Sequence, residues 1–203
     1  MRSKLNKKTQ KNVAVIIVIS AVIMRLVPHI PNFAPITAGA LFGASHLSKK
    51  YALLLPILMM AVSDYALLYI SPFSHPIFNF SHIQPISAMF NSTTLWVWGS
   101  FMVSGALGLF LRNKPGILKV GSITLLASLQ FYLITNFGVW AAGAYARNFS
   151  GLAASYVAGL PFLKWTIAGD LFYTAFFFMI YALATRQSES AEATQLESQT
   201  AGL

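Results

Sequence analysis

The sequence predicts an all-α membrane protein, a polytopic bundle of about six transmembrane helices with both termini in the cytoplasm. Its 203 residues are 56% hydrophobic and only 9% charged, which excludes an ordinary soluble domain. The apolar residues fall in long runs, and Lys and Arg gather between these runs, at 2–11, 49–50 and 112–119. The segment 71–91 contains neither Lys nor Arg, so the positive-inside rule places it outside the cell and the basic clusters inside.

These patterns divide the chain into a basic cytoplasmic N-terminus at 1–12, a six-helix transmembrane domain at 13–185 and a cytoplasmic tail at 186–203. The tail is rich in Ser, Glu and Thr without periodicity, so we expect it to be disordered. The expected location is the cell inner (plasma) membrane, in contact with the lipid bilayer. The basic clusters explain the net charge of +9, so no nucleic-acid partner is expected.

The first expected helix covers 13–24 and follows a basic stretch, which resembles a secretory signal peptide. Arg25 ends the apolar run, and the nearest small-x-small triplet, at 38–40, lies too far downstream for cleavage. We therefore expect an uncleaved first helix whose N-terminus is cytoplasmic.

The second expected span, 33–47, is short and rich in Ala and Gly. Its GxxxG motif forms a small-residue surface that another helix can approach closely. Two interpretations stay open: this surface packs inside the same bundle, or it docks another membrane subunit. In the second case the partner-docking residues are Gly39, Ala40, Gly43 and Ala44.

The third expected span, 51–70, carries Asp64 in its second half. The outer loop 71–91 follows, and it contains His75 and His82. Two histidines seven residues apart in a loop are more often incidental than metal ligands, so no metal is expected.

The fourth span, 93–111, begins with two tryptophans, which are typical of the membrane interface. The fifth span covers 116–143 and carries a polar stripe at helical spacing. The stripe consists of Ser128, Tyr132, Thr135 and Asn136.

The sixth span, 161–185, follows a weakly apolar outer connection at 145–160 and contains Asp170. A carboxylate inside a span costs a few kcal/mol, so it should face the bundle interior or a wet cavity and have a partner. Helical spacing places Thr166, Tyr173 and Thr174 on the same face as this acid.

Counting about 1.5 Å per residue places Arg25, Asp64, Asn136 and Asp170 in one layer of the outer half of the bundle. A salt bridge from Arg25 to either acid that only fixes packing is the plain alternative for any single residue. The whole set favours a binding site for a polar solute. The predicted substrate-binding residues are Arg25, Asn32, Asp64, Tyr132, Asn136, Trp140, Thr166, Asp170 and Tyr173. No cofactor is expected.

Four phrases of the sequence resemble a family of uncharacterised six-span bacterial membrane proteins. They are NFAPITAGALFGA at 32–44, SD at 63–64, SLQFYLITNFGVW at 128–140 and GLAASYVAGLPFLKWTIAGDLFYT at 151–174. The resemblance covers most of residues 25–180. That family is in turn similar, more distantly, to the substrate-binding S components of energy-coupling-factor (ECF) transporters.

This resemblance implies a subunit for uptake of a vitamin or micronutrient, and not an enzyme. Such a subunit is open to the outside and is driven by a separate membrane coupling protein with ATPase subunits. The sequence lacks a GxxxxGK[ST] phosphate loop, which agrees with ATPase activity residing in separate subunits. No substrate motif can be carried over residue by residue, so the substrate is unassigned.

Two other functions stay open. A proton-coupled carrier would use Asp170, although six spans without an evident inverted repeat make a poor secondary transporter. An intramembrane aspartyl enzyme would use Asp64 and Asp170, but the second acid follows Ala168-Gly169 where such enzymes have GxG. Arg25 at similar depth would also hold one carboxylate ionised, whereas an aspartyl dyad shares a proton.

Overall fold

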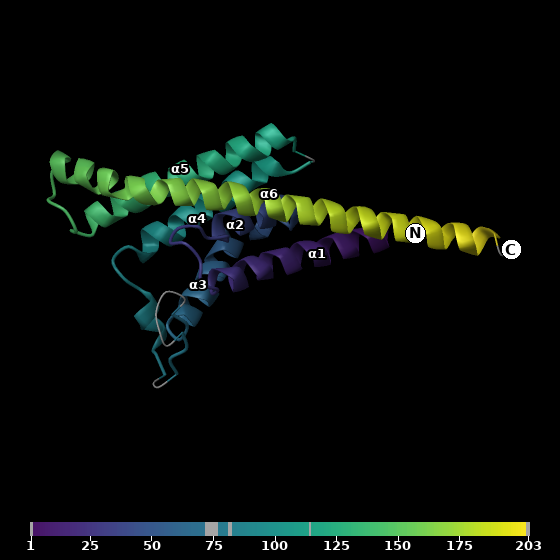
Figure 1. Ribbon diagram of the computed structural model, residues 1–203, viewed down its shortest axis with the longest axis horizontal. Coiled ribbons are helices and arrows are strands. Elements are labelled where there is room, and N and C mark those ends of the chain that lie inside the picture. The colour runs from purple at the N-terminus through teal and green to yellow at the C-terminus, as the bar shows by residue number, and fades with distance from the viewer. Residues whose placement is uncertain (1, 72–76, 81–82, 114, 202–203) are drawn as a thin grey trace.

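The computed structural model describes residues 2–71, 77–80, 83–113 and 115–201, and it confirms the all-α prediction (Figure 1). The α-helices among these residues are α1 (Arg2–Arg25), α2 (Ile36–His46), α3 (Leu54–Leu67), α4 (Thr94–Gly108), α5 (Ile117–Ala141) and α6 (Phe149–Ala201). Short 3₁₀ helices form at η1 (Lys49–Tyr51), η2 (Ile86–Met89) and η3 (Leu109–Leu111). The described residues contain no β-strand, and Ile70 and Phe78 form an isolated bridge.

Three of the helices are long and apolar enough to cross a membrane, which is compatible with a membrane protein. They are Thr94–Leu111, Ile117–Ala141 and Phe149–Arg186. By contrast, α2 and α3 contain 11 and 14 residues, or about 16 and 21 Å, against a hydrocarbon core of about 30 Å. The six-span topology therefore stays a prediction.

The short helix α2 lies at the centre of the bundle, and every residue from Ile36 to Ser45 is buried. It packs against α1, α3, α4 and α6, while α6 runs the length of the molecule and packs against α5 and α1 on the way (Figure 1). The N- and C-termini lie at the same end, so the far ends of α1 and α3 and the beginning of α2 meet away from the termini (Figure 1).

The small residues of α2 make this central position possible. A Cβ at Gly39 would lie 2.6 Å from Met59 Cε of α3 and 2.9 Å from Ala21 Cβ of α1. A Cβ at Gly43 would overlap the side chain of Leu55. Ala40 and Ala44 are also buried. The prediction that Gly39, Ala40, Gly43 and Ala44 dock a partner is thus wrong, because helices of this same chain already occupy that surface.

Helix α6 differs most from expectation. It begins at Phe149, so the segment 145–160 is mostly helix and not an outer connection. The side chain of Asn148 accepts a 2.8 Å hydrogen bond from the Gly151 amide, which starts the helix, and Pro161 lies within it. The helix also continues to Ala201, where a disordered tail is expected. Low hydrophobicity does not oppose helix formation there, since Ala, Glu and Gln have high helix propensity.

Candidate functional site

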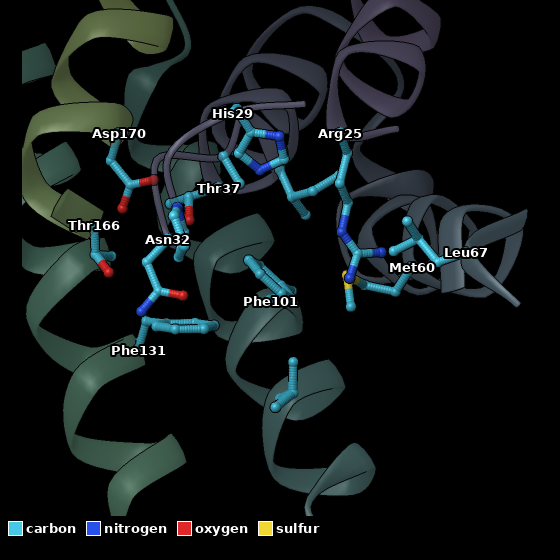
Figure 2. Close-up of a pocket in the computed structure, with 14 residues that line it drawn as sticks. Arg25, His29, Asn32, Thr37, Met60, Leu67, Phe101, Phe131, Thr166 and Asp170 are labelled. Carbon is cyan, nitrogen blue, oxygen red and sulfur yellow. The ribbon is translucent and has the colours of Figure 1, made fainter. Parts of the chain in front are cut away.

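A cavity of about 360 Å³ lies where α1 and α3 end and α2 begins, and it is flanked by the middle parts of α4, α5 and α6 (Figure 2). Its polar lining residues are Arg25, His29, Asn32, Thr37, Thr166 and Asp170. Its apolar lining includes Met60, Leu67, Val97, Phe101 and Phe131. Polar groups therefore converge from α1, α2, α6 and the α1–α2 connection on a largely apolar space.

Asp170 lies on the α6 wall of this cavity and is only 2% exposed. Ser128 of α5 donates a 2.7 Å hydrogen bond to its Oδ2, and the hydroxyl of Thr37, in the first turn of α2, also bonds the carboxylate. The polar stripes of the fifth and sixth predicted spans thus meet. Thr166, Tyr173 and Thr174 are buried with Asp170, as their shared helical face predicts.

A close backbone contact holds the α1–α2 connection against α6 beside this acid. A Cβ at Gly169 would lie 2.9 Å from the Cα of Phe33, so only glycine allows this approach. Asn32 precedes Phe33 with a φ of 65°, a conformation that Asn tolerates better than most residues. As a result, the side chain of Asn32 reaches the same cavity.

Arg25 lies on the opposite wall, at the end of α1 (Figure 2). Its Nη1 lies 2.6 Å from Asp64 Oδ1 of α3 and also donates to the Ser63 hydroxyl. Trp98 of α4 donates a 2.7 Å hydrogen bond from Nε1 to Asp64 Oδ2. The Arg25–Asp64 salt bridge considered for the sequence is therefore present, and it joins α1 to α3 and, through Trp98, to α4.

A second cavity of about 290 Å³ adjoins the first, and Arg25 and Val97 line both. Asp64 and Trp98 line the second cavity only. The two predicted acids consequently face different spaces, and neither accepts a hydrogen bond from the other. The shared-proton dyad of an aspartyl enzyme is not assembled by this arrangement.

Four predicted substrate-binding residues lie away from both cavities. Tyr132 donates to the Tyr156 carbonyl at 2.6 Å, Asn136 donates to the Tyr132 carbonyl at 2.8 Å, and Trp140 donates to the Ala146 carbonyl at 3.0 Å. Tyr173 packs its ring on Phe33, with centroids 5.4 Å apart.

The early start of α6 explains why Tyr132, Asn136 and Trp140 are absent from the cavity. The first turns of α6 pack against the far half of α5, so that Ser155 donates to the Asn136 carbonyl and Gly159 faces the Asn136 amide. The depth of Asp170 was predicted by counting from residue 161, the expected start of the sixth span, and it is wrong for the same reason. Asp170 is level with Ser128, eleven residues from one end of α5 and thirteen from the other.

Several lining residues are absent from the predicted set, namely His29, Thr37, Phe101 and Phe131. The prolines at 28, 31 and 35 mark an irregular connection, and this was the available signal for His29 and Thr37. Phe101 and Phe131 sit in apolar runs and carry no signal of their own. The described residues contain no group of three or more His, Asp or Glu suited to a metal, and His75 and His82 lie outside them.

Residues 5–194 match the model of a family of unknown function, DUF6580. No curated protein and no solved structure matches the chain. A link to the S components of ECF transporters is not among these findings and stays a prediction. Since the family model covers nearly the whole sequence, the chain belongs to the DUF6580 family of unknown function.

Proposed function

We propose that the chain is an integral membrane subunit that binds a small polar molecule for uptake into the cell. The observation that carries this proposal is the cavity between the helices, with Arg25 on one wall and Asp170 on the other. Small-molecule sites are concave and mostly apolar, with a few convergent polar groups, and volumes of about 300–1,000 Å³ are usual. The cavity of about 360 Å³ falls in this range.

The way the polar residues are held supports binding over a purely structural role. Polar groups that only join helices are consumed by contacts between those helices, as Tyr132 of α5 is by its hydrogen bond to the Tyr156 carbonyl of α6. Asn32 and Thr166 instead line the cavity together with Asp170, and Thr166, whose hydroxyl donates to the Phe162 carbonyl of its own helix, keeps its oxygen as an acceptor. Such a layout provides orientation for a bound solute within a rigid helical frame.

We further propose that a separate membrane coupling protein with ATPase subunits drives uptake, as in the ECF transporters, to whose S components the family resembled by this sequence is distantly similar. The small-residue surface of α2 cannot dock this partner because it is buried. A proton-coupled carrier that uses Asp170 is the second candidate, favoured by the burial of this carboxylate next to a cavity.

Identification of a retained small molecule tests the proposal. The chain is purified in mild detergent, washed and extracted, and the extract is compared by mass spectrometry with one from membranes that lack the chain. A Val97→Phe variant should lose the retained molecule, because Val97 lines both cavities and the larger ring would fill them.

Val103→Phe is the matched control. It places the same substitution on the same helix, at a side chain that is 40% exposed on the bundle surface. It should retain the molecule at the wild-type level. Equal retention by the Val97→Phe variant, or no molecule above background in well-folded wild-type protein, would contradict a small-molecule site here.

A further inference from the structure

We infer that the cavity binds an organic cation, a compact ammonium-type molecule with an apolar body, and that Asp170 is its counter-ion. This inference rests on the proposed function and adds the chemical class of the solute. It depends on the charges around the cavity, on the burial of Asp170 and on the aromatic wall between the two charged ends (Figure 2).

The positive charge of Arg25 is already compensated. Its guanidinium contacts Asp64 Oδ1 at 2.6 Å and the Ser63 hydroxyl, and Trp98 bonds the other oxygen of Asp64. An anionic ligand would have to take Arg25 from Asp64 and leave this carboxylate without a positive charge. A neutral or cationic ligand leaves the ion pair in place.

The negative charge of Asp170 is not compensated in the same way. Its hydrogen bonds come from Ser128 and Thr37, which are neutral hydroxyls, and no Lys, Arg or His within the described ranges forms an ion pair with it. Thr37 belongs to the first turn of α2, so the helix dipole adds about half an elementary positive charge there. A carboxylate that is 2% exposed still calls for a full positive charge nearby, from a ligand or a proton.

His29 is the other titratable group in the cavity lining, beside Arg25 and Asp170. Its Nδ1 lies 2.6 Å from the Val27 carbonyl oxygen, so this nitrogen carries a proton when it makes that hydrogen bond. This hydrogen bond holds one edge of the ring to the α1–α2 connection, to which both residues belong.

The walls of the cavity suit the apolar part of such a molecule. Phe101 and Phe131 are in contact, with tilted rings whose centroids lie 5.0 Å apart, and Met60 and Val97 complete this side. Aromatic faces attract ammonium groups and cover alkyl or aryl groups equally well. Asn32 and Thr166 can bond polar substituents near Asp170.

Three probes of similar shape and different charge test the inference on the wild-type protein. They are 2-phenylethylammonium, 2-phenylethanol and 3-phenylpropanoate, titrated by calorimetry into detergent-purified protein, with the Val97→Phe variant as the blank for micelle partition. The ammonium probe should bind at least about tenfold more tightly than the alcohol, and the carboxylate probe should bind most weakly. In Asp170→Asn the ammonium and alcohol probes should bind equally.

Asp64→Asn provides the opposite change, because it releases Arg25 and should raise the affinity for 3-phenylpropanoate. Equal binding of the ammonium and alcohol probes to the wild type would overturn the inference of an organic cation and favour a proton on Asp170. The proposal of a small-molecule site would remain. Tighter binding of 3-phenylpropanoate by the wild type would also overturn it. The proposed function fails separately, if the Val97→Phe variant retains the same co-purified molecule as the wild type.

Discussion

Arg25 is the charged residue that lines both cavities, and it pairs with Asp64. The sequence placed Arg25, Asp64 and Asp170 at similar depth and left open which acid, if either, would pair with the arginine. It also predicted that Asp170 and Ser128 face inward, from the period of the two polar stripes. Thr37 could not be predicted as their third partner, because helical spacing does not say which loop folds back onto an acid.

A double-mutant cycle measures the Arg25–Asp64 interaction. Arg25→Met leaves Asp64 with Trp98 alone, so we expect a loss of about 1–3 kcal/mol in the free energy of unfolding. Adding Asp64→Leu should recover part of this loss, because no unpaired charge is left. Melting temperatures in detergent provide the measurement. Fully additive effects would show that the ion pair contributes nothing to stability.

Thr174 tests the cost of a buried polar group. Its Oγ1 is buried and has no hydrogen-bond partner among the described residues. Thr174→Val keeps the shape and removes the unsatisfied oxygen, so stability should stay equal or rise by about 1 kcal/mol. Thr135→Val is the control, because that hydroxyl donates a 2.8 Å bond to Phe131. A clear destabilisation by Thr174→Val would show that a water molecule satisfies this hydroxyl.

At the scale of elements, close helix contacts at glycine organise the bundle. Composition identified the GxxxG motif of α2, but the same motif serves equally well within a chain or between chains. Only the packing of α1, α3 and α4 around α2 decides between these interpretations. The start of helix α6, in contrast, was not predicted from composition. Its first twelve residues were expected to be a connection outside the bundle, yet they are helical and pack on α5.

Alanine substitutions at two glycines of α4 distinguish the effect of close packing on stability from the effect of helix propensity. A Cβ at Gly105 would overlap the carbonyl oxygen of Ala52, whereas a Cβ at Gly99 would meet no atom within 4 Å. Gly105→Ala should therefore destabilise the protein by about 1–3 kcal/mol, since backbone cannot move aside as a flexible side chain can. Gly99→Ala should be neutral or stabilise by up to about 1 kcal/mol. Thermal unfolding of both variants checks this, and equal effects would refute the close contact between Gly105 and the Ala52 backbone.

At the scale of the whole molecule, the position of both termini at one end agrees with the predicted topology (Figure 1). Arg112 strengthens this arrangement, because it donates to the Ala44 and Leu47 carbonyls at 2.7 and 2.8 Å. The loop after α4 and the end of α2 therefore lie on one side of the bundle. The sequence predicted this side as cytoplasmic from its basic residues, but it could not predict that α2 and α3 are so short.

Cysteine labelling tests the topology, and the chain has no cysteine of its own. Suitable positions are Ser48, Gly116 and Ser150, which are all exposed. In intact cells a membrane-impermeant maleimide should label Ser150→Cys, and it should label Ser48→Cys and Gly116→Cys only after permeabilisation. Labelling of Ser48→Cys and Gly116→Cys from opposite sides would contradict the contact made by Arg112.

The depth of Asp170 along the helices should make the affinity for a cation depend on the membrane voltage. Its partner Ser128 lies near the midpoint of α5, so a spanning α5 would place the carboxylate close to the middle of the bilayer. A cation that moves from outside to this site would cross about half of the transmembrane voltage, which is worth about 1.2 kcal/mol per 100 mV. In liposomes, a potential of about 100 mV, negative inside, should then raise the affinity for 2-phenylethylammonium about sevenfold. The affinity for 2-phenylethanol should not change with voltage.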